Sequence, residues 1–176
     1  MPLLKQGKLI EDPWIHIPDE VAIPASGPAI ISLIRWRAER DALVEREDPL
    51  GVRLTADQTA GEVADDLDHL DLIALAFPVY TDGRAYSNAR RLRERYGFKG
   101  ELRAIGNVLR DQYLFMQRCG FDTLEVKEGE TEEDWRHAVG AISVAYQPAT
   151  DDSTTEPAQS LRQRRQAASF KMTASG

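Results

Sequence analysis

The sequence has one cysteine, Cys119, among 176 residues, so it cannot form an internal disulfide. It has no CxxC pair and no cluster of Cys and His, which argues against structural zinc and an iron–sulfur cluster held by this chain. The three histidines, His16, His69 and His137, fall on separate predicted elements without HxH or HExxH spacing. We therefore predict no metal site.

Long apolar runs are also missing. No stretch approaches the roughly 18 apolar residues of a membrane span, and the N-terminal MPLLKQGKLIEDPW lacks the apolar segment of a signal peptide. These absences predict a cytoplasmic protein without membrane association. Basic residues are too few for a general nucleic-acid binder, because the net charge is -7 and the pI is near 5.0.

Three nucleotide and catalytic motifs are absent. There is no GxGxxG at a strand-to-helix turn, no GxxxxGK[ST] and no GxSxG. No cofactor-binding motif is recognisable, so a flavin or NADPH would have to bind without one.

The composition that remains is that of a globular protein, with 42% hydrophobic and 29% charged residues. Five prolines within residues 1–28 predict an extended N-terminal arm rather than a helix. Residues 29–146 hold the regular apolar patterns and form the predicted α/β domain. Residues 147–176 are polar, with one basic cluster at 162–165, and predict a disordered tail whose cluster is a solvated charge run or docks an acidic partner.

Strand and helix patterns alternate through the predicted domain. The predicted strands are residues 29–33, 52–54, 71–77, 102–105 and 123–126. Each is followed by a helical pattern, at 34–46, 60–70, 85–96, 107–119 and 131–146. The continuous apolar run at 71–77 predicts the central strand. Five such units predict one α/β domain with a mainly parallel sheet, either open and doubly wound or a partial barrel.

Several local signals predict where helices begin and end. Thr59 and Glu62 have capping-box spacing, and Asn107 is a candidate helix cap. Gly97 and Gly120 each end a helical pattern where a left-handed residue is needed, and each precedes a Phe. Cys119 lies in a last helical turn, which favours a buried, unreactive thiol.

Ligands of parallel α/β sheets bind beyond the carboxyl ends of the strands, where helix N-termini point free N–H groups. The loops in these places are polar. The candidate ligand-binding residues are Tyr80, Thr81, Asp82, Arg84, Tyr86, Ser87, Arg110, Asp111 and Gln112. Thr55, Asp57, Gly106 and Asn107 follow neighbouring strands in the same way.

These residues suggest a small-anion site. Arg84 and Arg110 together are able to hold a carboxylate, sulfate or phosphate in a forked arrangement. The alternative is structural, with Arg84 paired to Asp111 and Arg110 paired to Asp82 across the loops. Tyr80 or Tyr86 is a candidate proton donor, against the alternative of an aromatic cap on the sheet.

Residues 77–122, FPVYTDGRAYSNARRLRERYGFKGELRAIGNVLRDQYLFMQRCGFD, resemble the core of the bacterial family called domain of unknown function 934. The family pattern is similar to FPxFTDGRGYSxARxLRERxGxxGELRAxGDVLRDQxxxxxRCGFD. This sequence departs from it at Tyr80, Ala85 and Asn107, where Phe, Gly and Asp are usual. The resemblance weakens outside this stretch and does not include the tail.

The resemblance implies a role in sulfur assimilation, because members of the family are found beside genes for sulfite reductase. It implies an accessory protein or oxidoreductase of sulfite reduction, with sulfite reductase or another sulfur-assimilation enzyme as its partner. Together with the polar loops at Arg84 and Arg110, it suggests that the protein binds a small oxoanion. The alternative is a non-catalytic sulfate or sulfite sensor, or a scaffold for sulfite reductase. The resemblance supplies no catalytic residue.

Overall fold

The computed structural model describes residues 2–135, which form one α/β unit around an eight-stranded sheet. The strand order is β2-β1-β8-β7-β6-β5-β4-β3, and the six strands from β8 to β3 are parallel. β1 and β2 are antiparallel additions beyond β8. The strands are β1 (Leu3–Lys5), β2 (Lys8–Ile10), β3 (Ile15–His16), β4 (Ala29–Ser32), β5 (Leu50–Leu54), β6 (Leu72–Phe77), β7 (Glu101–Gly106) and β8 (Thr123–Glu125).

Helical segments connect the parallel strands in turn. They are α1 (Leu33–Leu43), the 3-10 helix η1 (Ala60–His69), α2 (Arg84–Arg90) with the π-helical turn η2 (Arg91–Arg95), and the 3-10 turn η3 (Arg110–Gln112) with α3 (Tyr113–Arg118). The five predicted strands and the first four predicted helices are thus confirmed. Residues 132–135 are helical, and the rest of the predicted helix at 131–146 lies outside the described residues, as does the predicted tail at 147–176.

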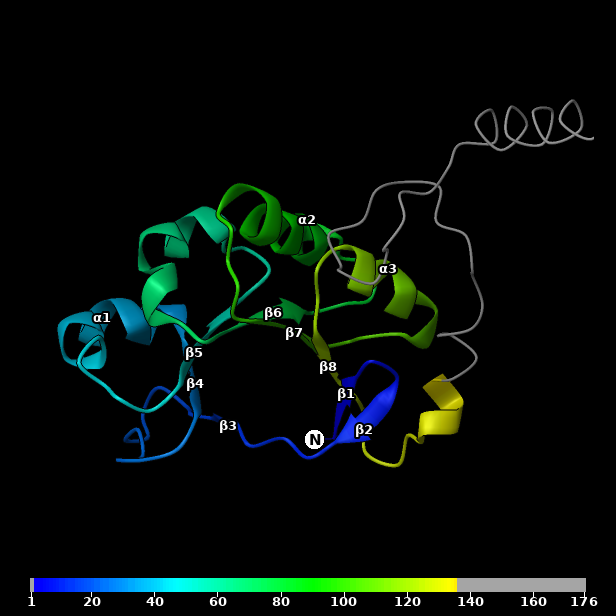
Figure 1. The fold of residues 1–176 in the computed structure, drawn as a ribbon, viewed down its shortest axis with the longest axis horizontal. Helices are drawn as coiled ribbons and strands as arrows, with labels where there is room; N and C mark the ends of the chain where they lie inside the picture. Colours follow the sequence, from blue (N-terminus) through cyan, green and yellow to red (C-terminus); the bar gives the residue numbers. More distant parts are fainter. Residues whose placement is uncertain (1, 136–176) are drawn as a thin grey trace, which may run out of the picture.

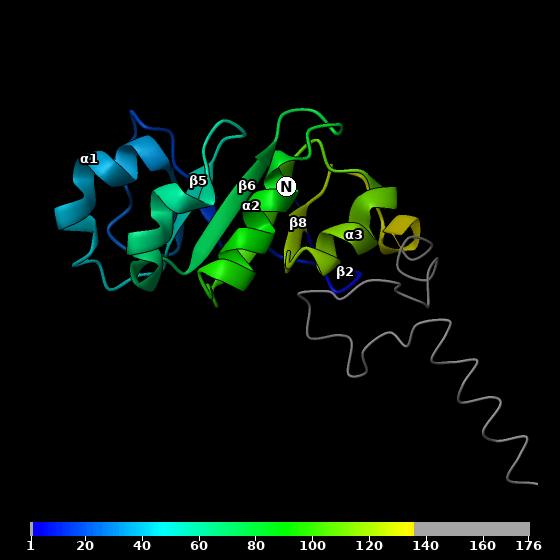
Figure 2. The same cartoon turned by 90° about the horizontal axis from the view of Figure 1, so that it is seen from above.

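Of the two predicted alternatives, an open doubly wound sheet and a partial barrel, the structure has the partial barrel. From β3 to β8 each strand pairs with the next one along the chain, so every right-handed crossover places its helix on the same face. In Figure 1 α2 and α3 lie above the strands and α1 lies beyond their left end, while the segment between β2 and β3 passes beneath them. Figure 2 shows α1, α2 and α3 side by side over the sheet.

The main core lies between the sheet and these helices. Alternate residues of β6, Ile73, Leu75 and Phe77, point into it, together with the fully buried Trp36 of α1. On the opposite, helix-free face Leu72 and Ala74 of β6 join a smaller apolar cluster with Ile30 and Ile105. β6 is therefore covered on both faces, as its continuous apolar sequence predicts.

The helix-free face is concave. His16 on β3 and Glu125 on β8 are five strand spacings apart along the sheet, or roughly 24 Å if the sheet were flat. Their side chains nevertheless meet, with His16 Nε2 2.6 Å from Glu125 Oε1. This contact requires the sheet to curl until its two sides approach one another, which is the geometry of a half-barrel.

The N-terminal arm contributes strands to the sheet. The sequence predicts an extended arm here, and the hairpin of β1 and β2 was not predicted. The hairpin turns at Gln6 and Gly7, whose φ angles of 50° and 77° suit a two-residue type I′ turn. Leu3 and Leu4 of β1 are almost fully buried, so the arm is part of the folded core.

The predicted helix ends are mostly confirmed. Gly97 and Gly120 have φ angles of 67° and 100°, and the Phe after each is buried. The Glu62 carboxylate accepts a hydrogen bond of 2.8 Å from the Thr59 N–H, as in a capping box. The cap predicted at Asn107 is wrong, because its side-chain amide donates to the Pro78 carbonyl across the neighbouring loop. No helix of residues 2–135 has both the length and the apolar content to cross a membrane.

Candidate functional site

Two arginines lie in one row on the concave face of the sheet. The register pairs Arg53 of β5 with Ala74 of β6, and Ala74 with Arg103 of β7. Residues paired in parallel strands point to the same side, so both guanidinium groups leave the sheet on its helix-free face. The single methyl group of Ala74 separates them.

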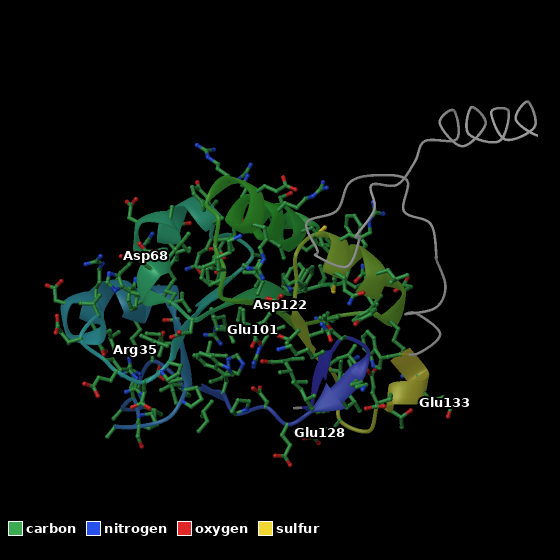
Figure 3. The ribbon with its side chains drawn as sticks, viewed as in Figure 1. Arg35, Asp68, Glu101, Asp122, Glu128 and Glu133 are labelled. Atoms are coloured by element: carbon green, nitrogen blue, oxygen red, sulfur yellow. The ribbon has the colours of Figure 1, made fainter. Side chains whose placement is uncertain are left out.

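Arg103 is fully buried and is surrounded by carboxylates. Its Nε donates to Glu101 Oε1 at 3.0 Å, and its Nη1 donates to Asp12 Oδ2 at 2.7 Å. Nη1 also lies 3.5 Å from Glu125 Oε1. Nη2 is 2.9 Å from Glu101 Oε1 but makes no hydrogen bond, so that contact is electrostatic. Figure 3 labels Glu101 near the centre of the molecule, among the side chains of this face.

The carboxylate of Glu125 links Arg103 to a histidine. Burial alone would raise its pKa, but the hydrogen bond from His16 and the charges of His16 and Arg103 outweigh burial and lower the pKa below 4.5. Glu125 is therefore ionised near neutral pH. A carboxylate only accepts hydrogen bonds, so His16 Nε2 carries the hydrogen that lies between them.

A cavity of about 460 Å³ opens beside this pair, at the carboxyl ends of β5, β6 and β7. Its polar lining comes from His16, Arg53, Thr55, Asn107 and Glu125, and its apolar lining includes Ala76, Phe77, Pro78 and Ile105. Within residues 2–135 Arg53 has no ion-pair partner, and its Nε is buried without an acceptor. The Arg53 side chain lines the cavity without a carboxylate partner from residues 2–135, so its guanidinium group is available to an anionic ligand.

A second cavity, of about 630 Å³, lies on the other side of His16 and Glu125. It is formed mainly by the N-terminal arm, including Asp12 and Trp14. His16 and Glu125 line both cavities, so this hydrogen-bonded pair stands between them.

The two predicted ligand-binding arginines already have carboxylate partners. Arg84 binds Asp82 of its own loop, with Nη2 2.6 Å from Oδ2 and Nε 3.0 Å from Oδ1. These hydrogen bonds lower the pKa of Asp82 to about 2. Arg110 lies 3.2 Å from Asp134 and 3.5 Å from Glu130. The predicted cross-loop ion pairs, Arg84 with Asp111 and Arg110 with Asp82, do not form.

The two predicted loops do lie side by side. The Gln112 amide donates to the Tyr80 carbonyl at 2.9 Å, which joins the loop after β6 to the loop after β7. Tyr80, Thr81, Ser87 and Asp111 are exposed on this rim. Anion binding by the rim residues remains a prediction.

Tyr86 belongs to the aromatic core on the helix face. Its ring centroid lies 5.1 Å from that of Phe77 and 4.8 Å from that of Phe115. Burial, followed by the nearby Cys119 and Asp111, raises its pKa to about 12. Its hydroxyl has no hydrogen-bond partner in the described part of the chain. These surroundings correspond to the structural alternative considered for Tyr86.

Cys119 is buried, and burial raises the pKa of its thiol. A thiol with a raised pKa is a poor nucleophile. This agrees with the predicted unreactive cysteine.

The predicted site residues all lie in or near the loops that follow the strands, so the concave-face residues were not among them. A usable signal is present in the strands themselves, where Glu101 and Arg103 alternate with the apolar Leu102 and Ala104. Arg53 stands between Val52 and Leu54 in the same way. Charged residues at alternate positions of otherwise buried strands indicate a polar inner face.

The fold and this inner face define an α/β protein with a curled, mostly parallel sheet and a polar cavity at the carboxyl ends of its strands. Residues 51–156, well over half of the chain, match the family model described as "Bacterial protein of unknown function (DUF934)". The chain therefore belongs to the DUF934 family. No curated protein matches it.

Proposed function

We propose that this protein binds a small oxoanion in the cavity beside Arg53 and acts as an accessory protein of assimilatory sulfite reduction. The observation that carries the anion site is the Arg53 side chain, which lines the cavity and has no ion-pair partner among the described residues. Sulfite as the anion, and sulfite reductase as the partner, rest on the family resemblance.

The charges on the concave face favour Arg53 over Arg103 as the anion ligand. Arg103 is surrounded by Asp12, Glu101 and Glu125, so a further anion beside it would meet three negative charges. Arg53 has no ion-pair partner among the described residues, and of these three carboxylates only Glu125 lines its cavity. A guanidinium group supplies planar, paired N–H donors that match the oxygens of sulfite, sulfate or phosphate.

The rim at Arg84 and Arg110 is the competing position for the anion. Both guanidinium groups there are at least 44% exposed in their side chains and hold carboxylates. An incoming anion would have to displace those carboxylates in water, where charge pairs contribute little. The Arg53 cavity is therefore the better candidate.

Thermal unfolding with added anions tests the site, because a ligand that binds the folded state raises Tm. Sulfite should raise the Tm of the parent protein progressively, compared with chloride at matched ionic strength. Arg53→Gln should abolish this rise, whereas Arg84→Gln should keep it. If Arg53→Gln is stabilised as much as the parent, the assignment of the cavity is wrong. If Arg84→Gln alone loses the effect, the rim binds the anion.

The role in sulfite reduction has its own test. A deletion strain should grow on cysteine but grow poorly on both sulfate and sulfite, and the parent gene should restore growth. Normal growth of the deletion strain on sulfite would contradict a role in sulfite reduction. Co-elution with sulfite reductase, or a change in its turnover on addition of this protein, is the biochemical counterpart. If neither is seen, the partnership is wrong.

A further inference from the structure

The hydrogen-bonded pair of His16 and Glu125 has the arrangement of a proton-exchanging dyad. Glu125 Oε1 accepts a hydrogen bond of 2.6 Å from the Nε2–H of the imidazole, and Arg103 Nη1 lies 3.5 Å from the same carboxylate oxygen. Glu125 has a side-chain exposure of 8%, so its position is set by the protein rather than by solvent. A histidine oriented by a buried carboxylate exchanges protons through its remaining nitrogen, here Nδ1.

The same imidazole lines the cavity that contains Arg53. His16 is partly exposed, at 34% of its side chain, so its ring is reachable from the cavity while its Nε2 stays engaged. A ligand in the cavity would therefore meet a permanent cation at Arg53 and a group able to gain a charge at His16. Glu125 would stabilise the imidazolium that forms.

We propose that His16 is the proton acceptor of the oxoanion site, and that the ligand is bound as a dianion between Arg53 and an imidazolium at His16. This proposal rests on the proposed function. When a hydrogen oxoanion such as hydrogen sulfite enters, its acidic proton moves to Nδ1, the bond to that proton breaks, and a new N–H bond forms. When the ligand enters already as a dianion, His16 Nδ1 takes its proton from solvent instead. In both cases the bound state is the same.

Charged groups on every neighbouring element bear on this titration. They are Glu11 and Asp12 of the N-terminal arm, Arg53 of β5, Arg103 of β7 and Glu125 of β8. Glu125 is hydrogen-bonded to the ring, and Arg103 forms an ion pair with Asp12.

Sulfate is the suitable probe, because it stays a dianion throughout the pH range in which histidine titrates. Isothermal titration calorimetry in two buffers of different ionisation enthalpy counts the protons taken up on binding. The parent protein should take up as much as one proton per sulfate where free His16 is neutral. In that pH range the affinity for sulfate should fall by up to tenfold for each unit by which the pH rises, since proton uptake and binding are linked.

His16→Gln is the deciding variant. Glutamine keeps an N–H donor for Glu125 but cannot titrate, so a merely structural role for His16 would survive the change. The variant should bind sulfate more weakly, take up no proton and lose the pH dependence. Arg53→Gln should lose binding altogether.

The possible failures are distinguishable. If the parent protein binds no sulfate, both the proposed function and this inference are overturned. If it binds sulfate without proton uptake, or if His16→Gln takes up as many protons as the parent, the anion site stands and His16 is not its proton acceptor.

Discussion

Among single residues, Arg103 has the most demanding surroundings. It is the only cation within ion-pair distance of Asp12 and Glu101 among the described residues, and it also faces Glu125. A buried charge is tolerated when its partners compensate it, and removing one partner leaves the others uncompensated. Arg103 and its three carboxylates therefore stabilise the fold only when all of them are present.

Replacing Arg103 with Met should lower the free energy of unfolding by about 3–5 kcal/mol, because it leaves carboxylates facing one another in a buried site. Urea unfolding at pH 7 measures this. Arg110→Gln, at an exposed ion pair, is the control and should cost at most about 1 kcal/mol. If Arg103→Met also costs less than about 1 kcal/mol, the carboxylates around Arg103 do not form a buried cluster with it.

The same variant has a defined pH dependence. The pKa of Glu125 is lowered on folding, so its contribution is fully present above its ordinary value of 4.5 and is lost as pH falls through the folded value. The parent therefore loses stability in acid, whereas the variant's repelling carboxylates gain from taking up protons. The difference between parent and variant should shrink below pH 4.5.

For Tyr86, in contrast to Arg103, removing the buried polar group should cost little stability. Its hydroxyl is buried without a partner in the described residues, while its ring packs on Phe77 and Phe115. Tyr86→Phe removes the unsatisfied group and keeps the ring, so stability should stay within about 1 kcal/mol of the parent or rise. Tyr86→Ala should cost about 3–5 kcal/mol. A large loss for Tyr86→Phe in urea unfolding would show that the hydroxyl has a partner.

At the scale of elements, the N-terminal arm is the least expected part of the structure. β1 pairs with β2 on one side and β8 on the other, and Leu4 of β1 is completely buried. The arm also supplies Asp12 to Arg103 and His16 to Glu125. It therefore completes both the core and the concave face.

Leu4→Ala should lower the free energy of unfolding by about 2–5 kcal/mol, as for other large-to-small changes in cores. Ile10→Ala in the neighbouring β2 is the matched control, because Ile10 is 40% exposed. It should cost about 1 kcal/mol or less. Equal losses in thermal or urea unfolding would indicate that the arm is not packed as described.

The elements differ in how far the sequence predicts them. The buried strands at β4 to β8 carry continuous or alternating apolar residues, so their places are predictable from period alone. β1 and β2 are three residues each, too short for a period to be read. The cluster at Arg103 joins residues 12, 101 and 125, and only the curl of the sheet, which depends on all strands together, brings them into contact.

For the whole molecule, the curl of the sheet is itself testable. Cysteines introduced at His16 and Glu125 should be joined by a thiol cross-linker of about 10 Å, since a flat sheet would hold these positions roughly 24 Å apart. The product is detected by mass spectrometry of linked peptides. Cross-linking should fall sharply in concentrated urea. Equal yields under both conditions would contradict the curled sheet.

The pairing of β1 with β8 has a consequence for synthesis. Residues 3–5 pair with residues 123–125, whereas each of the strands from β3 to β8 pairs with the strand next to it along the chain. During synthesis on the ribosome, β3 to β7 can thus pair progressively as they emerge. Leu3 and Leu4 of β1 cannot pair with β8 until Glu125 has left the exit tunnel. The first strand to be synthesised is therefore among the last to complete its pairing in the sheet.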